Sequence, residues 1–106
     1  MPYGLLDSDL QHIHDAIESF DNVAEVLLFG SRAKGSYKTG SDVDLVVKGD
    51  RISYRIIAAL ADGLNEDKPL PYFFDVVHYE TLAEPQLKAH IDRVGIVIFQ
   101  RSYCSK

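Results

Sequence analysis

Three aspartates of this 106-residue chain lie where their carboxylates could bind divalent metal ions. Asp42 and Asp44 are two residues apart in residues 41–47, a segment of apolar and β-branched residues that predicts a strand. Residues two apart on a strand point to the same face, so both carboxylates project together. Two neighbouring anions repel each other, and a hard divalent cation with oxygen ligands would offset that repulsion.

A third carboxylate, Asp75, lies inside the apolar segment 72–77, which we also predict to be a strand. An aspartate among apolar residues costs free energy unless it is satisfied. If this strand neighbours the strand of Asp42 and Asp44, the three carboxylates form a ligand set for two Mg²⁺ ions about 3.5–4 Å apart. Each signal alone is weaker, because strand-end aspartates often face water and Asp75 could be an ordinary edge-strand residue.

A candidate phosphate loop follows the predicted buried strand at residues 23–29. Such a loop can present backbone N–H groups to an anion, and a helix N-terminus adds its dipole. Gly30 permits close backbone approach, the Ser31 hydroxyl can donate to a phosphate oxygen, and Arg32 and Lys34 supply positive charge. The alternative is a plain strand-to-helix turn, with Ser31 as its N-cap and two solvated cations.

Apolar periodicity predicts the elements that position these residues. A first helix is expected from Ser8, which with Gln11 fits a capping box, to Asp21-Asn22. Further helices are expected over 52–64 and from Pro85 to Gly95, with Pro69 and Pro71 breaking the chain between them and a last strand at 96–99. The order αβαβαβ with a late extra strand predicts an α/β (α+β) fold, a mixed sheet flanked by helices, in a single domain over residues 1–106.

Composition narrows the function classes. The net charge of −5 disfavours binding to long nucleic acid. The single cysteine, Cys104, cannot form an internal disulfide, which favours a reducing, cytoplasmic setting. We expect no signal peptide and no membrane span, because no apolar run is long enough.

The motifs GSRAKG at residues 30–35 and SDVDLVV at residues 41–47 closely resemble the signature of the DNA-polymerase-β-like nucleotidyltransferase superfamily. Within it the chain looks like a minimal nucleotidyltransferase (MNT), and the resemblance covers nearly the whole chain in element order. It implies a nucleotidyltransferase fold. It also implies that Gly30 and Ser31 hold a nucleoside triphosphate, and that Arg32 and Lys34 occupy the family's basic positions.

The same resemblance gives roles to the carboxylates. It implies that Asp42 and Asp44 bind two Mg²⁺ ions, and that Asp75 completes the metal site and helps to deprotonate the acceptor.

The resemblance also implies a partner. MNT proteins are commonly paired with a small all-helical HEPN protein in a toxin–antitoxin system, with the MNT protein as antitoxin. The expected reaction is transfer of AMP from ATP to a tyrosine of that partner, within a hetero-oligomer. Two alternatives remain open: an antitoxin that masks its partner without chemistry, and a two-chain nucleotidyltransferase that modifies a small molecule such as an aminoglycoside.

Three histidines are given no role in this site. His12 and His14 are two apart on the predicted first helix, do not share a face, and are expected to face solvent. His78 lies just after the strand of Asp75 and is expected to be an ordinary strand-end residue.

Overall fold

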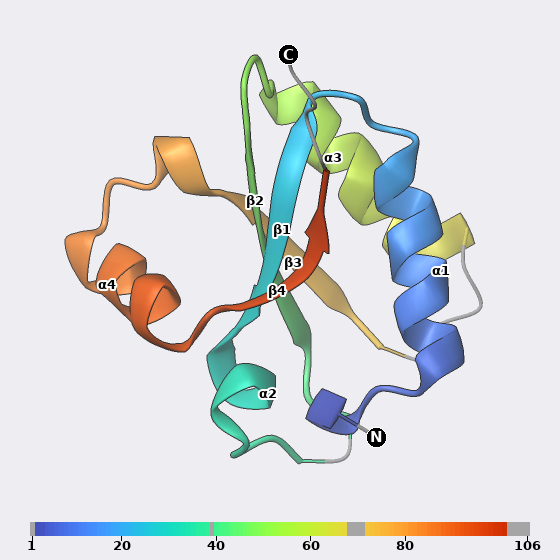
Figure 1. Cartoon of the computed structure of the whole chain (residues 1–106), viewed down its shortest axis with the longest axis vertical. Helices are drawn as coiled ribbons and strands as arrows, with labels where there is room; N and C mark the ends of the chain where they lie inside the picture. Colours follow the sequence, from blue (N-terminus) through green and yellow to red (C-terminus); the bar gives the residue numbers. More distant parts are fainter. Residues whose placement is uncertain (1, 39, 68–71, 102–106) are drawn as a thin grey trace.

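The computed structural model describes residues 2–38, 40–67 and 72–101, so Pro69, Pro71 and Cys104 lie outside it (Figure 1). Its centre is a four-stranded sheet in the order β3-β2-β1-β4. The strands are β1 (Val23–Phe29), β2 (Val43–Gly49), β3 (Phe74–His78) and β4 (Ile96–Gln100). β1 runs antiparallel to β2 and β4, whereas β2 and β3 are parallel, so the predicted mixed sheet is confirmed.

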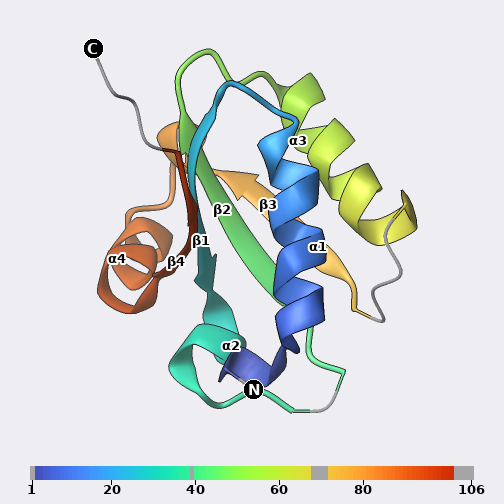
Figure 2. The same ribbon diagram turned by 45° about the vertical axis from the view of Figure 1, so that its right-hand side comes forward.

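Helices cover both faces of this sheet. The α-helices are α1 (Asp7–Glu18), α2 (Gly30–Lys34), α3 (Tyr54–Asp62) and α4 (Pro85–Val94). Short turns of helix occur at η1 (Pro2–Gly4), η2 (Gly63–Asp67) and η3 (Tyr79–Thr81). Figures 1 and 2 show α1 and α3 together on one side of the sheet, α4 on the other, and α2 at the end of β1. In the described part of the chain, no helix is long and apolar enough to cross a membrane.

The strand alternation divides the core into two clusters. On the α1 and α3 face, Val26 and Leu28 of β1 pack with apolar residues of both helices. On the α4 face, Leu27 and Phe29 of the same strand pack with Ile91 of α4. Every residue of the central strand β1 therefore has a buried or half-buried environment, which explains why all of its residues but Glu25 are apolar.

The first helix begins earlier than predicted. Its N-cap is Leu6 and not Ser8, and the Leu6 amide donates to Asp9 Oδ2 at 3.0 Å. Asp9 is only 6% exposed and also accepts a hydrogen bond from the Tyr72 hydroxyl at 2.7 Å. Asp9 therefore plays the N3 role of the capping box, which the Ser8–Gln11 spacing had assigned to Gln11. Its carboxylate is oriented by Tyr72, a residue far away in the sequence.

The segment after α3 fixes the start of β3. Predicted helix 52–64 is observed as α3, capped by the Ser53 side chain, followed by the π-helical turn η2. From this turn Asn65 accepts from the Phe74 amide at 2.7 Å and donates to the Phe74 carbonyl at 3.1 Å. Its side chain thus pairs with the backbone of an edge strand, directly before Asp75.

Candidate active site

Two of the three aspartates lie side by side across neighbouring strands. In the parallel β2–β3 pair, Asp44 is in register with Asp75. The two strands are therefore neighbours, which is the condition under which the carboxylates were expected to converge. Asp42 is exposed and directly precedes β2. Asp44 and Asp75 alternate with Leu45 and Phe74 of the α1 and α3 cluster, so the two carboxylates point to the α4 face of the sheet.

The electrostatics of Asp44 show that these carboxylates lie close together. Its pKa is raised from the usual aspartate value by burial, and further by the negative charges of Asp75 and then Asp42. Among the described residues, no lysine, arginine or histidine forms an ion pair with any of the three. A half-buried carboxylate with two acidic neighbours and no cationic partner has the donor chemistry that a hard divalent cation requires.

Gly30 brings the candidate phosphate loop against the carboxylates. It follows β1, whose last residue, Phe29, is in register with Asp44. Its φ of +76° is a left-handed conformation, and a Cβ at this position would lie 2.2 Å from Asp44 Oδ2. Only glycine fits here without strain or collision, so the loop and the carboxylates form one contiguous site.

The local structure around Ser31 differs from an ordinary capped turn. α2 begins at Gly30, and its N-cap is Phe29, whose side chain cannot cap. Ser31 lies inside the first turn, half-buried, and the alternative that made it the N-cap is wrong. α2 has only five residues, so its dipole contributes little, and the backbone amides and the Ser31 hydroxyl are the anion-binding groups that this loop offers.

Arg32 is buried, with 3% of its surface exposed, and its guanidinium is already used within the protein. Nε and Nη2 donate to the Ser41 carbonyl at 3.2 and 2.8 Å, and Nη1 donates to the Tyr3 carbonyl at 2.9 Å. The charge also lies over the Tyr37 and Tyr72 rings, 5.3 and 4.9 Å from their centres. Since Ser41 directly precedes Asp42, these contacts tie α2 to the segment that carries the first aspartate.

This geometry assigns the two basic residues of the loop differently. Contact between Arg32 and a phosphate would require its hydrogen bonds to the Ser41 and Tyr3 carbonyls to break. Lys34 lies exposed in the last turn of α2.

His90 is a site residue that the sequence did not indicate. It lies on α4, half-buried, and its Nε2 accepts a hydrogen bond from the Gly30 amide at 3.3 Å. The contact joins residues 60 positions apart, and nothing in the local sequence of α4 distinguishes His90 from a surface histidine.

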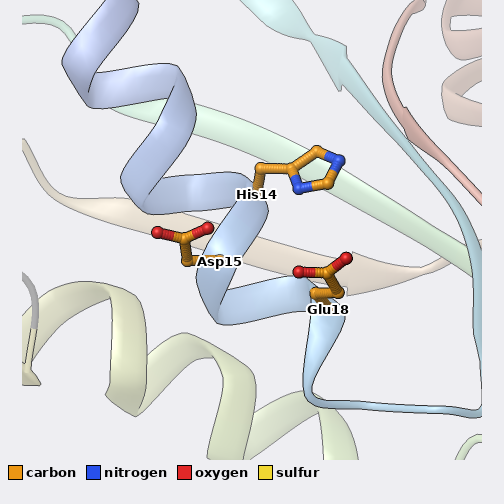
Figure 3. Close-up of side chains that lie close together, drawn as sticks. All are labelled: His14, Asp15 and Glu18. Atoms are coloured by element: carbon orange, nitrogen blue, oxygen red, sulfur yellow. The ribbon is translucent and has the colours of Figure 1, made fainter.

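The other histidines lie elsewhere. His12 and His14 are half-buried, so the expectation that both face solvent is wrong, and His14 packs against the Phe99 ring at 4.7 Å. The potential ligand atoms of His14, Asp15 and Glu18 lie within 4.8 Å of one another on α1 (Figure 3), on the opposite face of the sheet from Asp44. His78 ends β3, with its Nε2 3.0 Å from Glu80.

A groove of about 390 Å³ lies between α3 and the edge strand β3, and Asp75 is one of the residues that line it. Two large side chains in it are exposed, Tyr54 at 85% and Phe73 at 60%. Asp62 and Glu66 add negative charge to its lining. The groove is therefore partly apolar and acidic, and Asp75 is the one aspartate of the candidate site among its lining residues.

Solved structures that match this fold include toxin–antitoxin proteins and a nucleotidyltransferase. A chain from a toxin–antitoxin crystal structure with AMP-PNP matches at a TM-score of 0.73 and 20% identity, over 91% of this chain and 75% of that one. A chain from the MntA–HepT toxin–antitoxin structure matches at 0.69 and 17% identity, over 91% and 74%. A protein of Sulfolobus solfataricus assigned as a nucleotidyltransferase matches at 0.53 and 21%, over 87% and 77%. These likenesses establish the nucleotidyltransferase fold.

The sequence itself supplies the family. The family model described as "Polymerase beta, Nucleotidyltransferase" matches residues 11–103. The chain therefore belongs to the polymerase-β-like nucleotidyltransferase family, which confirms the resemblance found in its motifs. No curated protein has a significantly similar sequence.

Proposed function

We propose that this chain is a Mg²⁺-dependent nucleotidyltransferase that transfers AMP from ATP to a hydroxyl group of a protein partner. The observation that carries the proposal is the pairing of Asp44 with Asp75 directly against Gly30. It joins a metal-binding set of carboxylates to a loop that can hold a triphosphate.

In this proposal, Asp42, Asp44 and Asp75 hold two Mg²⁺ ions. When bound, such ions neutralise charge on the triphosphate and favour departure of pyrophosphate. The raised pKa of Asp44 indicates an anionic cluster that lacks compensation within the protein. Metal binding would remove that repulsion, so the cluster suits a ligand that is both cationic and rich in coordination sites.

The donor is held by the loop. The Ser31 hydroxyl and the backbone amides that follow Gly30 donate hydrogen bonds to phosphate oxygens, and Lys34 supplies a cation from the end of α2. AMP-PNP in the crystal structure of a similar fold supports ATP as the donor.

The transfer step forms one bond and breaks one. The acceptor oxygen attacks the α-phosphorus, and the bond between that phosphorus and the bridging oxygen of pyrophosphate breaks. Asp75 is exposed and lines the groove, so in this proposal it accepts the proton that the acceptor hydroxyl loses.

The acceptor is proposed to be a tyrosine of a helical HEPN toxin, with this chain as the antitoxin. The MNT resemblance and the fold shared with MntA–HepT chains support this partner, and the groove of Tyr54, Phe73 and Asp75 provides a docking surface. Its acidic lining favours a partner whose docking face carries basic side chains. The complex would act in the cytoplasm, where ATP is available. Masking without transfer and modification of a small molecule remain the competing functions.

Calorimetric titration with AMP-PNP tests the nucleotide site. The wild-type chain should bind AMP-PNP only when Mg²⁺ is present. Asp42→Asn or Asp44→Asn should abolish this Mg²⁺-dependent binding. Asp50→Asn is the matched control, because Asp50 is an exposed aspartate beyond the opposite end of β2. If Mg²⁺-dependent binding persisted in both site variants, the proposal that Asp42 and Asp44 bind Mg²⁺ would be wrong.

A further inference from the structure

We propose that His90 is a positioning residue of the phosphate loop, holding Gly30 in the one backbone conformation that opens the loop to a triphosphate. The inference rests on the proposed function, and it assigns a role to a residue outside the loop and carboxylate motifs.

Gly30 needs an external restraint. Glycine populates left-handed and right-handed backbone conformations with similar ease, so its own chemistry does not select the observed φ of +76°. The Gly30 amide is also the first in α2 and has no acceptor within that helix. The hydrogen bond to His90 Nε2 supplies both the missing acceptor and the restraint.

The imidazole is itself held in place. The edge of the His90 ring meets the Phe29 ring, with their centres 6.2 Å apart and their planes at 77°. The next residue of α4, Ile91, is buried in the cluster on this face and anchors the helix to the sheet. His90 therefore belongs to a helix that is anchored to the sheet, and from there it can restrain the backbone of Gly30.

The hydrogen bond also defines the chemical state of His90. A nitrogen that accepts from an amide carries no proton, so the ring is the neutral tautomer with its proton on Nδ1. An Nε2 atom that accepts from the Gly30 amide cannot also donate to an anion. Its effect on a triphosphate is exerted through the backbone of Gly30, beside the Asp44 carboxylate.

Two substitutions separate this role from packing. His90→Phe keeps an aromatic ring against Phe29 but removes the acceptor, whereas His90→Gln retains a side-chain acceptor. His14→Phe is the control, because His14 also packs against an aromatic ring but lies on α1.

The first readout is nuclear magnetic resonance of the nucleotide-free protein. The wild-type spectrum should show an unprotonated His90 Nε2 and a Gly30 amide protected from hydrogen exchange. His90→Phe should lose that protection, and His90→Gln should restore part of it. A Gly30 amide equally protected in wild type and His90→Phe would overturn the proposal.

The second readout is calorimetric titration with AMP-PNP and Mg²⁺. The loss of one neutral hydrogen bond should weaken binding about three- to tenfold in His90→Phe, with recovery in His90→Gln and no change in His14→Phe. Unchanged affinity in His90→Phe would overturn the positioning role and leave the nucleotide site standing. Failure of the wild-type chain to bind AMP-PNP would instead overturn the proposed function.

Discussion

Replacing Arg32 with lysine tests how the phosphate loop is joined to the metal-binding segment. The guanidinium of Arg32 makes three hydrogen bonds to the carbonyl groups of Ser41 and Tyr3, in a site that is almost fully buried. A lysine keeps the charge but lacks the planar fork that reaches both carbonyls at once. At least one carbonyl should therefore lose its partner.

The size of the effect follows from these contacts. A hydrogen bond from a charged donor contributes about 1.5–3 kcal/mol, and a carbonyl left without a partner adds to the loss. We expect Arg32→Lys to lower the free energy of unfolding by roughly 2–4 kcal/mol. For a domain of this size that corresponds to a fall in Tm of about 10–25 °C.

Thermal unfolding and calorimetry together decide the role of Arg32. The Tm of Arg32→Lys should fall, and Mg²⁺ affinity should fall with it, because Ser41 directly precedes Asp42. The control Lys34→Gln, at an exposed position, should leave the Tm nearly unchanged while weakening AMP-PNP binding. If Arg32→Lys had an unchanged Tm and much weaker AMP-PNP binding, this reasoning would be refuted. That result would indicate that Arg32 contacts the triphosphate directly.

Three further predictions concern the site itself. Ser31→Ala should weaken AMP-PNP binding by roughly 1–3 kcal/mol, and Gly30→Val should weaken it more, because a Cβ there meets Asp44; titration checks both. When a chelator has removed Mg²⁺, the raised pKa of Asp44 has a consequence for stability. At a pH between the ordinary pKa and the raised one, the folded protein holds a proton on Asp44 that the unfolded chain has lost. Stability should therefore fall as pH rises from the ordinary value of 3.8 through the raised one, and Asp44→Asn should flatten that fall in denaturant titrations. Asp75→Asn should stop AMP transfer but leave the partner bound, which size-exclusion chromatography and intact-mass measurement would show; lost transfer together with a lost complex would contradict the role of Asp75 as the base.

The strands were predictable because the pattern of apolar residues along the chain largely determines where they lie. The predicted strand 23–29 coincides with β1, since a short, largely apolar run bounded by a turn and by Gly30 is typical of a buried strand. Alternation likewise gave the face of each aspartate within its own strand, whereas the convergence of Asp44 and Asp75 depended on the two strands being neighbours, as the structure shows. These features depend on residue periodicity, which the sequence displays directly.

The features that the sequence did not reveal depend on contacts between distant segments. The role of Arg32 depends on the carbonyls of Tyr3 and Ser41 and on the ring of Tyr72, and no local pattern reveals that these groups surround it. The start of α1 at Asp7 depends similarly on Asp9, whose carboxylate is also held by Tyr72. His90 was missed for the same reason, because its partner is a backbone amide on another element.

The most direct test of the central claim is the intact mass of the helical partner after incubation of the purified complex with ATP and Mg²⁺. We predict that the partner gains the mass of one AMP group on a tyrosine, that pyrophosphate is released, and that the Asp75→Asn complex shows neither. A partner of unchanged mass that is still neutralised in cells would contradict the enzymatic account and establish masking in its place.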